Sequence, residues 1–230
     1  STLFPYTTLF RSPYSGTEAG ALVQNAEAAL RAAKSAGEKY LHHKREMSSA
    51  VVSRLNMEHR LRGALERQEF ELHYQPQIDI SSHRIVGVEA LLRWRDPESA
   101  ALVAPAEFLP LLESTGLIVP VGEWVMQQAA KDTQRWRAAG LQPVRTAVNI
   151  SPLQLRRRAF VDQLLEAISG WTDELWGLDI EVTEGVLVDD VTSVVAKLRS
   201  VRRSQVRVAL DDFGTGYYME IGRASCRERV

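Results

Sequence analysis

The fold of this 230-residue chain is decided by four short stretches: Glu89-Ala-Leu-Leu-Arg-Trp94, Asn149-Ile-Ser151, Glu181-Val-Thr-Glu184 and Asp211-Asp-Phe-Gly-Thr-Gly-Tyr217. In each stretch a carboxylate or a carboxamide stands at the end of an apolar run that is typical of a strand. Hard divalent cations such as Mg²⁺ and Mn²⁺ prefer carboxylate, amide and water oxygens as ligands. The pattern therefore predicts a divalent cation site at the ends of several strands.

The pair Asp211-Asp212 sharpens this prediction. Adjacent residues on a strand point to opposite faces, so both acids reach one site only where the strand ends and the backbone turns. Gly214 and Gly216 follow at once and favour such a turn. The alternative role for Asp212 is to satisfy the backbone of that turn.

Hydrophobic periodicity predicts a parallel α/β architecture. Alternation indicates a strand over 70–80, with Pro76 favouring an edge position, and a second strand over 83–89. Further strands are expected over 145–150, 178–183 and 206–210, and helices over 105–113, 122–139, 152–169 and 190–200. Strands and helices that alternate in this way favour βαβ units, and a barrel built from them carries its active site at the carboxyl ends of the strands.

Two helices are expected ahead of this region. Apolar residues at helical spacing predict one over 17–40, with Thr17 as N-cap, and another over 51–68. The first has no core of its own, so it must pack on a partner segment. Residues 42–46 are expected to form a polar linker, because His42 and His43 lack the spacing of a helical ligand pair.

Composition excludes several classes of protein. The chain is 45% hydrophobic and 25% charged, as in an ordinary globular domain. No apolar run reaches the ~18 residues of a membrane span, and a net charge of −1 argues against a nucleic-acid surface. The single cysteine, Cys226, suits a reducing compartment. These properties predict a soluble, cytoplasmic chain.

The two ends are expected not to be native protein. Residues 1–12 and 220–230 resemble translations of a common short-read sequencing adapter, read on opposite strands. Such segments are excluded from reasoning about the fold. The alternative is a pair of native, flexible termini.

The four stretches, together with Tyr74-Gln-Pro76 and Pro105-Ala-Glu-Phe108, resemble the EAL domain. The resemblance covers residues 55–217 and implies a (β/α)₈ barrel of the TIM type, incomplete in this chain. It also implies hydrolysis of cyclic di-GMP to linear pGpG with two Mg²⁺ or Mn²⁺ ions. Two metals in such a site activate the attacking water and stabilise the attacking and leaving oxygens.

The resemblance implies a role for each motif residue. Glu89, Asn149, Glu181 and Asp211 would bind metal, with Asp211 bridging the two ions, and Asp212 would complete the second metal position. Glu184 would hold the loop from Asp212 to Tyr217. Arg93 would contact a substrate phosphate, and Gln75 the guanine or a phosphate.

Two further assignments keep alternatives, and one basic run is left out of the site. Asn149 could instead cap the helix that follows it. Arg93 could pair with a neighbouring acid. The run Arg156-Arg-Arg158 is interpreted as a solvated helix face rather than a nucleotide site.

Residues 13–46 resemble the C-terminal end of a GGDEF (diguanylate cyclase) domain, through Asn25-Ala-Glu-Ala-Ala-Leu30 and Ala33-Lys34. Residues 47–56 are then a linker helix, and residues 57–219 are the N-terminal part of an EAL domain. The expected partner is cyclic di-GMP, with no nucleic-acid polymer and no membrane segment in this fragment. A homodimer is the assembly that the family suggests for the parent, which missing upstream domains could anchor to a membrane.

The chain departs from the family after Tyr217, where Tyr218-Met219 replace the usual residues. About three further strands, and with them a lysine and a glutamate of the family's site, are then missing. We therefore expect the fragment to be inactive although its parent is a phosphodiesterase. The rival interpretation is a degenerate EAL domain that binds cyclic di-GMP as a receptor without cleaving it.

Overall fold

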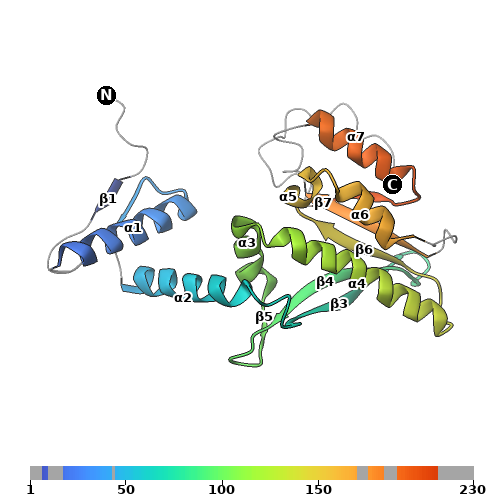
Figure 1. Ribbon diagram of the computed structural model, residues 1–230, viewed down its shortest axis with the longest axis horizontal. Coiled ribbons are helices and arrows are strands. Elements are labelled where there is room, and N and C mark those ends of the chain that lie inside the picture. The colour runs from blue at the N-terminus through green and yellow to red at the C-terminus, as the bar shows by residue number, and fades with distance from the viewer. Residues whose placement is uncertain (1–6, 10–17, 43–44, 170–175, 184–190, 212–230) are drawn as a thin grey trace. The chain divides into compact units, whose positions relative to one another are not determined.

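The computed structural model describes residues 7–9, 18–42, 45–169, 176–183 and 191–211 (Figure 1). They fall into two compact units, residues 1–63 and residues 64–230.

The first unit contains two short strands and two helices. Strand β1 (Thr7–Leu9) pairs in parallel with β2 (Tyr40–His42), and the helices are α1 (Ala19–Ala36) and α2 (Arg45–Leu61). The buried face of α1 consists of small side chains, among them Ala28, Ala29 and Ala33. These alanines form one apolar stripe along the helix, in agreement with the predicted amphipathic helix.

Several predictions for this unit are corrected by the structure. Helix α1 is shorter than expected, with Glu18 at its N-cap position, and Thr17 lies outside the described residues. The segment expected to be a polar linker instead contributes His42 to β2 and Arg45 to α2. Residues 7–9 of the adapter-like segment form β1, where no strand was expected, because the edge of β2 offers backbone groups to an extended Thr-Thr-Leu segment.

The second unit is built on a six-stranded sheet in the order β3-β4-β6-β7-β8, with β5 paired to β4. The bounds are β3 (Phe70–Ile78), β4 (Ile85–Arg95), β5 (Leu102–Val103), β6 (Arg145–Ile150), β7 (Gly177–Thr183) and β8 (Val208–Asp211). Strand β4 is antiparallel to β3 and β5, whereas the pairs from β4 through β8 are parallel. The predicted parallel βαβ architecture is thus confirmed from β4 onward, and Pro76 lies on the edge strand β3.

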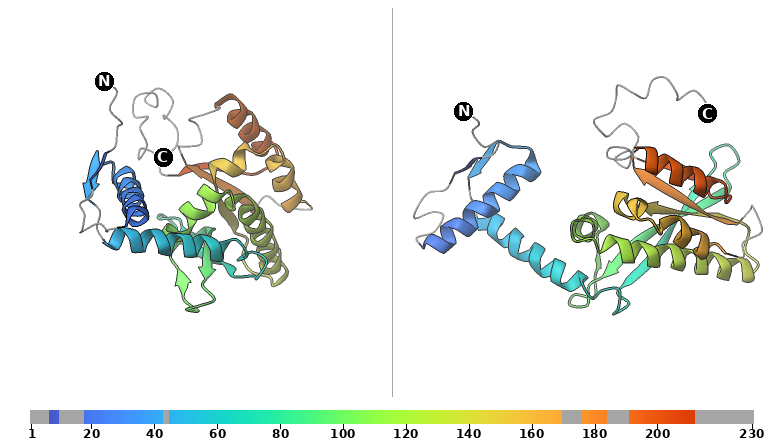
Figure 2. Two further views of the ribbon diagram at one scale, coloured as in Figure 1. Left: turned by 60° about the vertical axis from the view of Figure 1, so that its left-hand side comes forward. Right: turned by 45° about the horizontal axis from the view of Figure 1, so that its top comes forward.

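Helices cover one face of this sheet (Figures 1 and 2). They are α3 (Pro105–Thr115), α4 (Ile118–Ala138), α5 (Pro152–Arg156), α6 (Phe160–Ala167) and α7 (Val191–Arg202). The core between the layers is apolar and aromatic: Trp94 and Phe108 are fully buried and meet edge to face, with ring centroids 6.1 Å apart. A fully buried polar contact crosses it, a 2.8 Å hydrogen bond between the hydroxyls of Thr133 and Thr146.

Element boundaries differ from the sequence prediction where tertiary packing intervenes. The helix expected over 152–169 is two helices, α5 and α6, and α4 begins at Ile118 rather than at residue 122. Strand β5 was not predicted, because two residues are too short to show a period. The side chains of Arg156, Arg157 and Arg158 are exposed as predicted, but α5 ends at Arg156, so the run does not form a helix face.

Within the described ranges, no single helix is long and apolar enough to cross a membrane. Helices α3 and α4 satisfy the length and composition test only as a pair, bent by 120°.

The face of the sheet opposite the helices is polar. Near the start of the parallel strands, Arg145 on β6 forms an ion pair with Asp179 on β7. Its Nε donates to both carboxylate oxygens at 2.9 and 2.8 Å. Arg145 also donates to the carbonyl oxygen of Gln205, while the backbone N–H of Arg207 donates to Asp179. One guanidinium and one carboxylate thereby join β6, β7 and the segment that leads into β8.

Gly177 gives the guanidinium of Arg145 its space. A Cβ atom at residue 177 would lie 2.3 to 2.5 Å from three guanidinium atoms of Arg145. We therefore expect Gly177→Ala to displace Arg145 from Asp179 and to lower the free energy of unfolding by roughly 1–3 kcal/mol, the usual cost of overpacking. Urea denaturation followed by tryptophan fluorescence measures this, because all five tryptophans lie in the second unit.

The matched control is Gly20→Ala on α1, where a Cβ meets nothing within 4 Å. It introduces the same methyl group into the first unit and should leave the tryptophan-detected transition unchanged. An unaltered midpoint for Gly177→Ala would show that Arg145 can move aside without cost, against the structural role given to the ion pair.

Candidate functional site

Four of the predicted site residues lie on neighbouring strands and on one face of the sheet. Asn149 on β6 is directly opposite Glu181 on β7 in the register. Glu89 on β4 is opposite Ala147, two residues before Asn149, and Asp211 on β8 is opposite Thr183, two residues after Glu181. Residues two apart on a strand share a face. The described structure thus gathers Glu89, Asn149, Glu181 and Asp211, as predicted.

The position of Glu89 differs from the prediction in one respect. Strand β4 does not end at Glu89 but continues to Arg95, because its second half pairs with β3 and β5. Parallel pairing of β4 with β6, however, covers only residues 87–90. Glu89 therefore lies where the parallel sheet ends, although its own strand does not.

Asn149 contacts Glu89 directly and does not cap a helix. Its Nδ2 donates to Oε1 of Glu89 at 2.7 Å. The N-cap of α5 is Ser151, whose Oγ accepts from the N–H of Gln154 while the side chain of Gln154 accepts from the N–H of Ser151. This capping box fulfils the role that was the alternative for Asn149, and leaves the amide of Asn149 at the site.

Glu181 lies in an unfavourable environment for a negative charge. Partial burial raises the pKa of its carboxyl above the usual range, and the negative charges of Glu89 and Asp211 raise it further. Gln77 on β3 opposes this shift by donating from Nε2 to Oε1 of Glu181 at 3.5 Å. Acids brought together in this way are typical of functional sites, where a cation or a proton relieves the repulsion.

The described side chains fit a divalent cation by their chemistry, since all four present oxygen atoms. Among the described residues, however, no three Asp, Glu, His or Cys side chains lie close enough together to hold a metal ion. Asp212 and Glu184, the remaining acids of the predicted site, lie outside the described residues.

A cavity of about 440 Å³ opens beside these residues. Asn149, Glu181 and Asp211 line its polar side, and α3 and α4 supply an apolar wall that includes Leu109 and Val121. Arg93 also lines the cavity, with one guanidinium nitrogen donating to the carbonyl oxygen of Leu92 at 2.9 Å. Gln75 is not part of this lining; it is exposed on β3, opposite Glu89 in the register.

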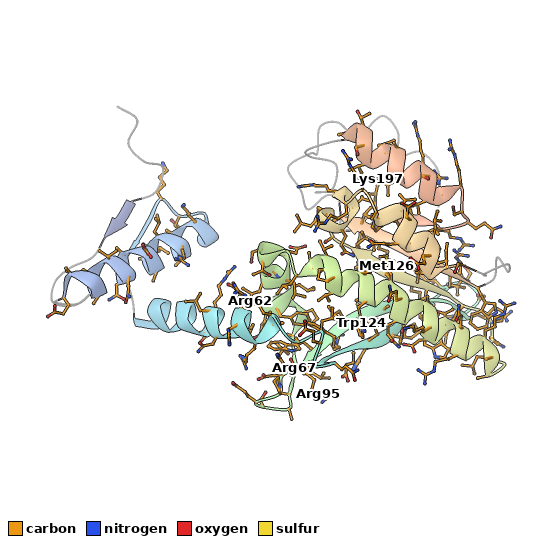
Figure 3. All side chains as sticks on the ribbon, viewed as in Figure 1. Arg62, Arg67, Arg95, Trp124, Met126 and Lys197 are labelled. Atoms are coloured by element: carbon orange, nitrogen blue, oxygen red, sulfur yellow. The ribbon has the colours of Figure 1, made fainter. Side chains whose placement is uncertain are left out.

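The end of β6 that carries Asn149 is held by α5 and α7. Lys197, labelled on α7 in Figure 3, donates from Nζ to the carbonyl oxygens of Leu155 at 2.7 Å and Arg157 at 2.9 Å. These carbonyls belong to the C-terminal turn of α5, where a cation is favourable. Together with the capping box, this contact fastens both ends of the short helix that follows Asn149.

Comparison with known proteins identifies the family. The sequence profile of the EAL domain matches residues 58–219. The chain belongs to the EAL domain family. The EAL fold is a TIM-like barrel, and the parallel strands with helices on one face form part of it, so the predicted EAL-type α/β fold is confirmed.

Relatives of known or assigned activity include two bacterial signalling proteins. The chain is 38% identical over 206 residues to MucR of Pseudomonas aeruginosa, a bifunctional diguanylate cyclase and cyclic di-GMP phosphodiesterase, covering 89% of the chain and 30% of MucR. It is 33% identical over 207 residues to the cyclic di-GMP phosphodiesterase PdeR of Escherichia coli, covering 90% of the chain and 31% of PdeR. The chain thus spans about a third of the length of these relatives.

Solved structures show the same likeness. The complex of the MucR phosphodiesterase with c-di-GMP superposes with a TM-score of 0.65 at 39% identity, over 70% of this chain and 65% of that one. The cAMP-bound EAL enzyme Bd1971 gives a TM-score of 0.63 at 28% identity, over 75% of this chain and 48% of that one.

The raised pKa of Glu181 predicts a pH-dependent cost to the metal-free protein. The folded state holds the proton of Glu181 to higher pH than the unfolded state does, so stability falls as the pH rises from about 4.3, the ordinary glutamate pKa, through the folded pKa. Glu181→Gln removes this cost. We expect the variant to be more stable than the wild type at pH 7 to 8 in the presence of EDTA, and equally stable below about pH 4.

Thermal unfolding at a series of pH values provides the measurement. Glu166→Gln, on the exposed surface of α6, is the matched control and should follow the wild type at every pH. A Glu181→Gln variant that is less stable than the wild type at neutral pH would contradict the repulsion inferred here.

Proposed function

We propose that this chain is part of a cyclic di-GMP phosphodiesterase that hydrolyses the cyclic dinucleotide to linear pGpG. One observation carries the proposal: Glu89, Asn149, Glu181 and Asp211 share one face on four adjacent strands, and the last three of them line the polar side of a cavity. The names of MucR and PdeR agree with it, since both are phosphodiesterases of this dinucleotide.

In this proposal Glu89, Asn149, Glu181 and Asp211 would hold two Mg²⁺ or Mn²⁺ ions, with Asp211 shared by both and Asp212 as a further ligand of the second. When bound, the metals supply an activated water and neutralise the phosphoryl oxygens. The protein contributes the arrangement of its donors. Asn149 directs its amide at Glu89, and the mutual repulsion that raises the pKa of Glu181 favours uptake of a cation. Glu184 is proposed to hold the loop after Asp212.

The cavity is suited to the nucleotide part of the substrate. Its apolar wall from α3 and α4 offers a surface for a purine, and the guanidinium of Arg93 lies at the same cavity for a phosphate. Arginine matches the geometry of phosphate oxygens well. Gln75, opposite Glu89 on the edge strand, is proposed to contact the guanine or a phosphate from the strand side.

The upstream residues are proposed to belong to a diguanylate cyclase domain, with residues 13–46 as its C-terminal end and 47–56 as a linker helix within α2. The alignment with bifunctional MucR supports this, because its 206 residues exceed the stretch from 58 to 219 that matches the EAL domain. The proposal places the protein in the cytoplasm, with a homodimer as the assembly of its EAL domain.

Hydrolysis of cyclic di-GMP to pGpG tests the function, measured on the natural protein that carries this sequence with Mg²⁺ or Mn²⁺ present. Glu89→Ala should lower the rate by at least about 100-fold, since even residues that only orient metal ligands cost 10–100-fold when replaced. EDTA should abolish turnover, and Mn²⁺ should restore it.

Glu166→Ala on α6 serves as the control and should retain full activity. Binding of cyclic di-GMP without turnover with either metal would identify a receptor instead of an enzyme. Absence of both binding and turnover would overturn the proposed function.

A further inference from the structure

In the described structure, Glu181 accepts a side-chain hydrogen bond from Gln77, a residue on a distant strand of the same sheet. Gln77 lies on the edge strand β3, and Glu181 lies on β7, with β4 and β6 between them. Its Nε2 nevertheless reaches Oε1 of Glu181 at 3.5 Å. Alternation along the strand places Gln77 on the same face as Gln75.

Gly87 makes this reach available. Gly87 stands directly opposite Gln77 in the register of β3 and β4. A Cβ atom at Gly87 would lie 2.7 Å from Oε1 of Gln77 and 3.3 Å from the carbonyl oxygen of Arg145. Any side chain at residue 87 would therefore push the amide of Gln77 off the strand surface, because the backbone on its other side leaves little room to shift.

The amide of Gln77 acts on a carboxylate that its neighbours repel. Glu89 and Asp211 both oppose a negative charge on Glu181, so a carboxylate free to rotate would turn away from them. A donor on Oε1 restricts the rotation of the carboxylate and leaves its second oxygen without that contact. Partners that orient metal-binding side chains in this way usually contribute strongly to metal affinity.

We propose that Gln77 is a positioning residue that orients the carboxylate of Glu181 for metal binding, and that the absence of a side chain at Gly87 is what allows it to do so. The inference rests on the proposed function, because it assigns Glu181 to a metal. Gln77 itself touches neither the substrate nor a metal in this assignment.

Mn²⁺ binding to the metal-free chain, measured by electron paramagnetic resonance of the free ion, tests the inference without relying on activity. Gln77→Met keeps the length of the side chain and removes the donor. We expect about tenfold weaker Mn²⁺ binding, at the lower end of the range for residues that orient ligands. Gly87→Ala should weaken binding to a similar extent, although it leaves Gln77 in place.

The double variant Gln77→Met/Gly87→Ala separates this mechanism from two unrelated defects. If both changes act through one hydrogen bond, the double variant binds Mn²⁺ no more weakly than the weaker single variant. Two independent defects would multiply instead, and would overturn the pairing of Gln77 with Gly87. If Gln77→Met folds poorly, Gly87→Ala carries the test, provided that its thermal unfolding matches that of the wild type.

Gln163→Met is the matched control. Gln163 on α6 also donates from Nε2 to a glutamate, Oε2 of Glu123 at 3.0 Å, but within the helical layer. It should bind Mn²⁺ like the wild type. Wild-type affinity in Gln77→Met would overturn the inference alone, provided that Glu181→Gln weakens binding. A wild-type chain whose Mn²⁺ binding is insensitive to Glu181→Gln would overturn the metal site of the proposed function and the inference with it.

Discussion

The ion pair between Arg145 and Asp179 is the interaction on which the geometry of the site depends. Arg145 precedes Asn149 by four residues on β6, and Asp179 precedes Glu181 by two on β7, so all four side chains share one face. A register slip of one residue would send Asn149 and Glu181 to the opposite face, among the helices. A buried pair of this kind contributes more to the choice of register than to net stability, because desolvation of both charges offsets most of their attraction. The same pair binds the segment before β8 through Gln205 and Arg207, and so determines where Asp211 emerges.

The two faces of the sheet divide stability from function. The face under the helices is apolar, and its single described hydroxyl pair, Thr133 and Thr146, is satisfied internally. The other face carries the acids, whose repulsion raises the pKa of Glu181 and works against the metal-free fold. Binding a cation to the folded state alone would recover this free energy by mass action. Cation binding would therefore stabilise the folded state. This is common at functional sites, where like charges are held together at a cost to the stability of the unliganded fold.

The extent to which the sequence predicts this structure follows from the range of the interactions involved. Strands β6 and β7 were predicted within one residue because their alternation is local, and the positions of Asn149 and Glu181 near the ends of these strands followed for the same reason. The break between α5 and α6, and the continuation of β4 beyond Glu89, depend on packing and on pairing with β5, which no local period encodes. The roles of Gln77 and Asp179 were missed on the same grounds. Gln77 acts on a residue 104 positions away, so only the folded sheet reveals its partner.

That contact also constrains the curvature of the sheet. In a flat sheet β3 and β7 would be about 14 Å apart, three strand spacings, and side chains stand roughly perpendicular to the sheet rather than along it. The side chains of Gln77 and Glu181 could not meet in such an arrangement, whereas strands that curl around a common axis point their inner side chains at one another. The polar face is therefore the inner face of a barrel arc, and the curl that the backbone adopts is what converts residues on separate strands into one site. A substitution that flattens the arc would separate Gln77 from Glu181 before it altered any neighbouring pair of strands.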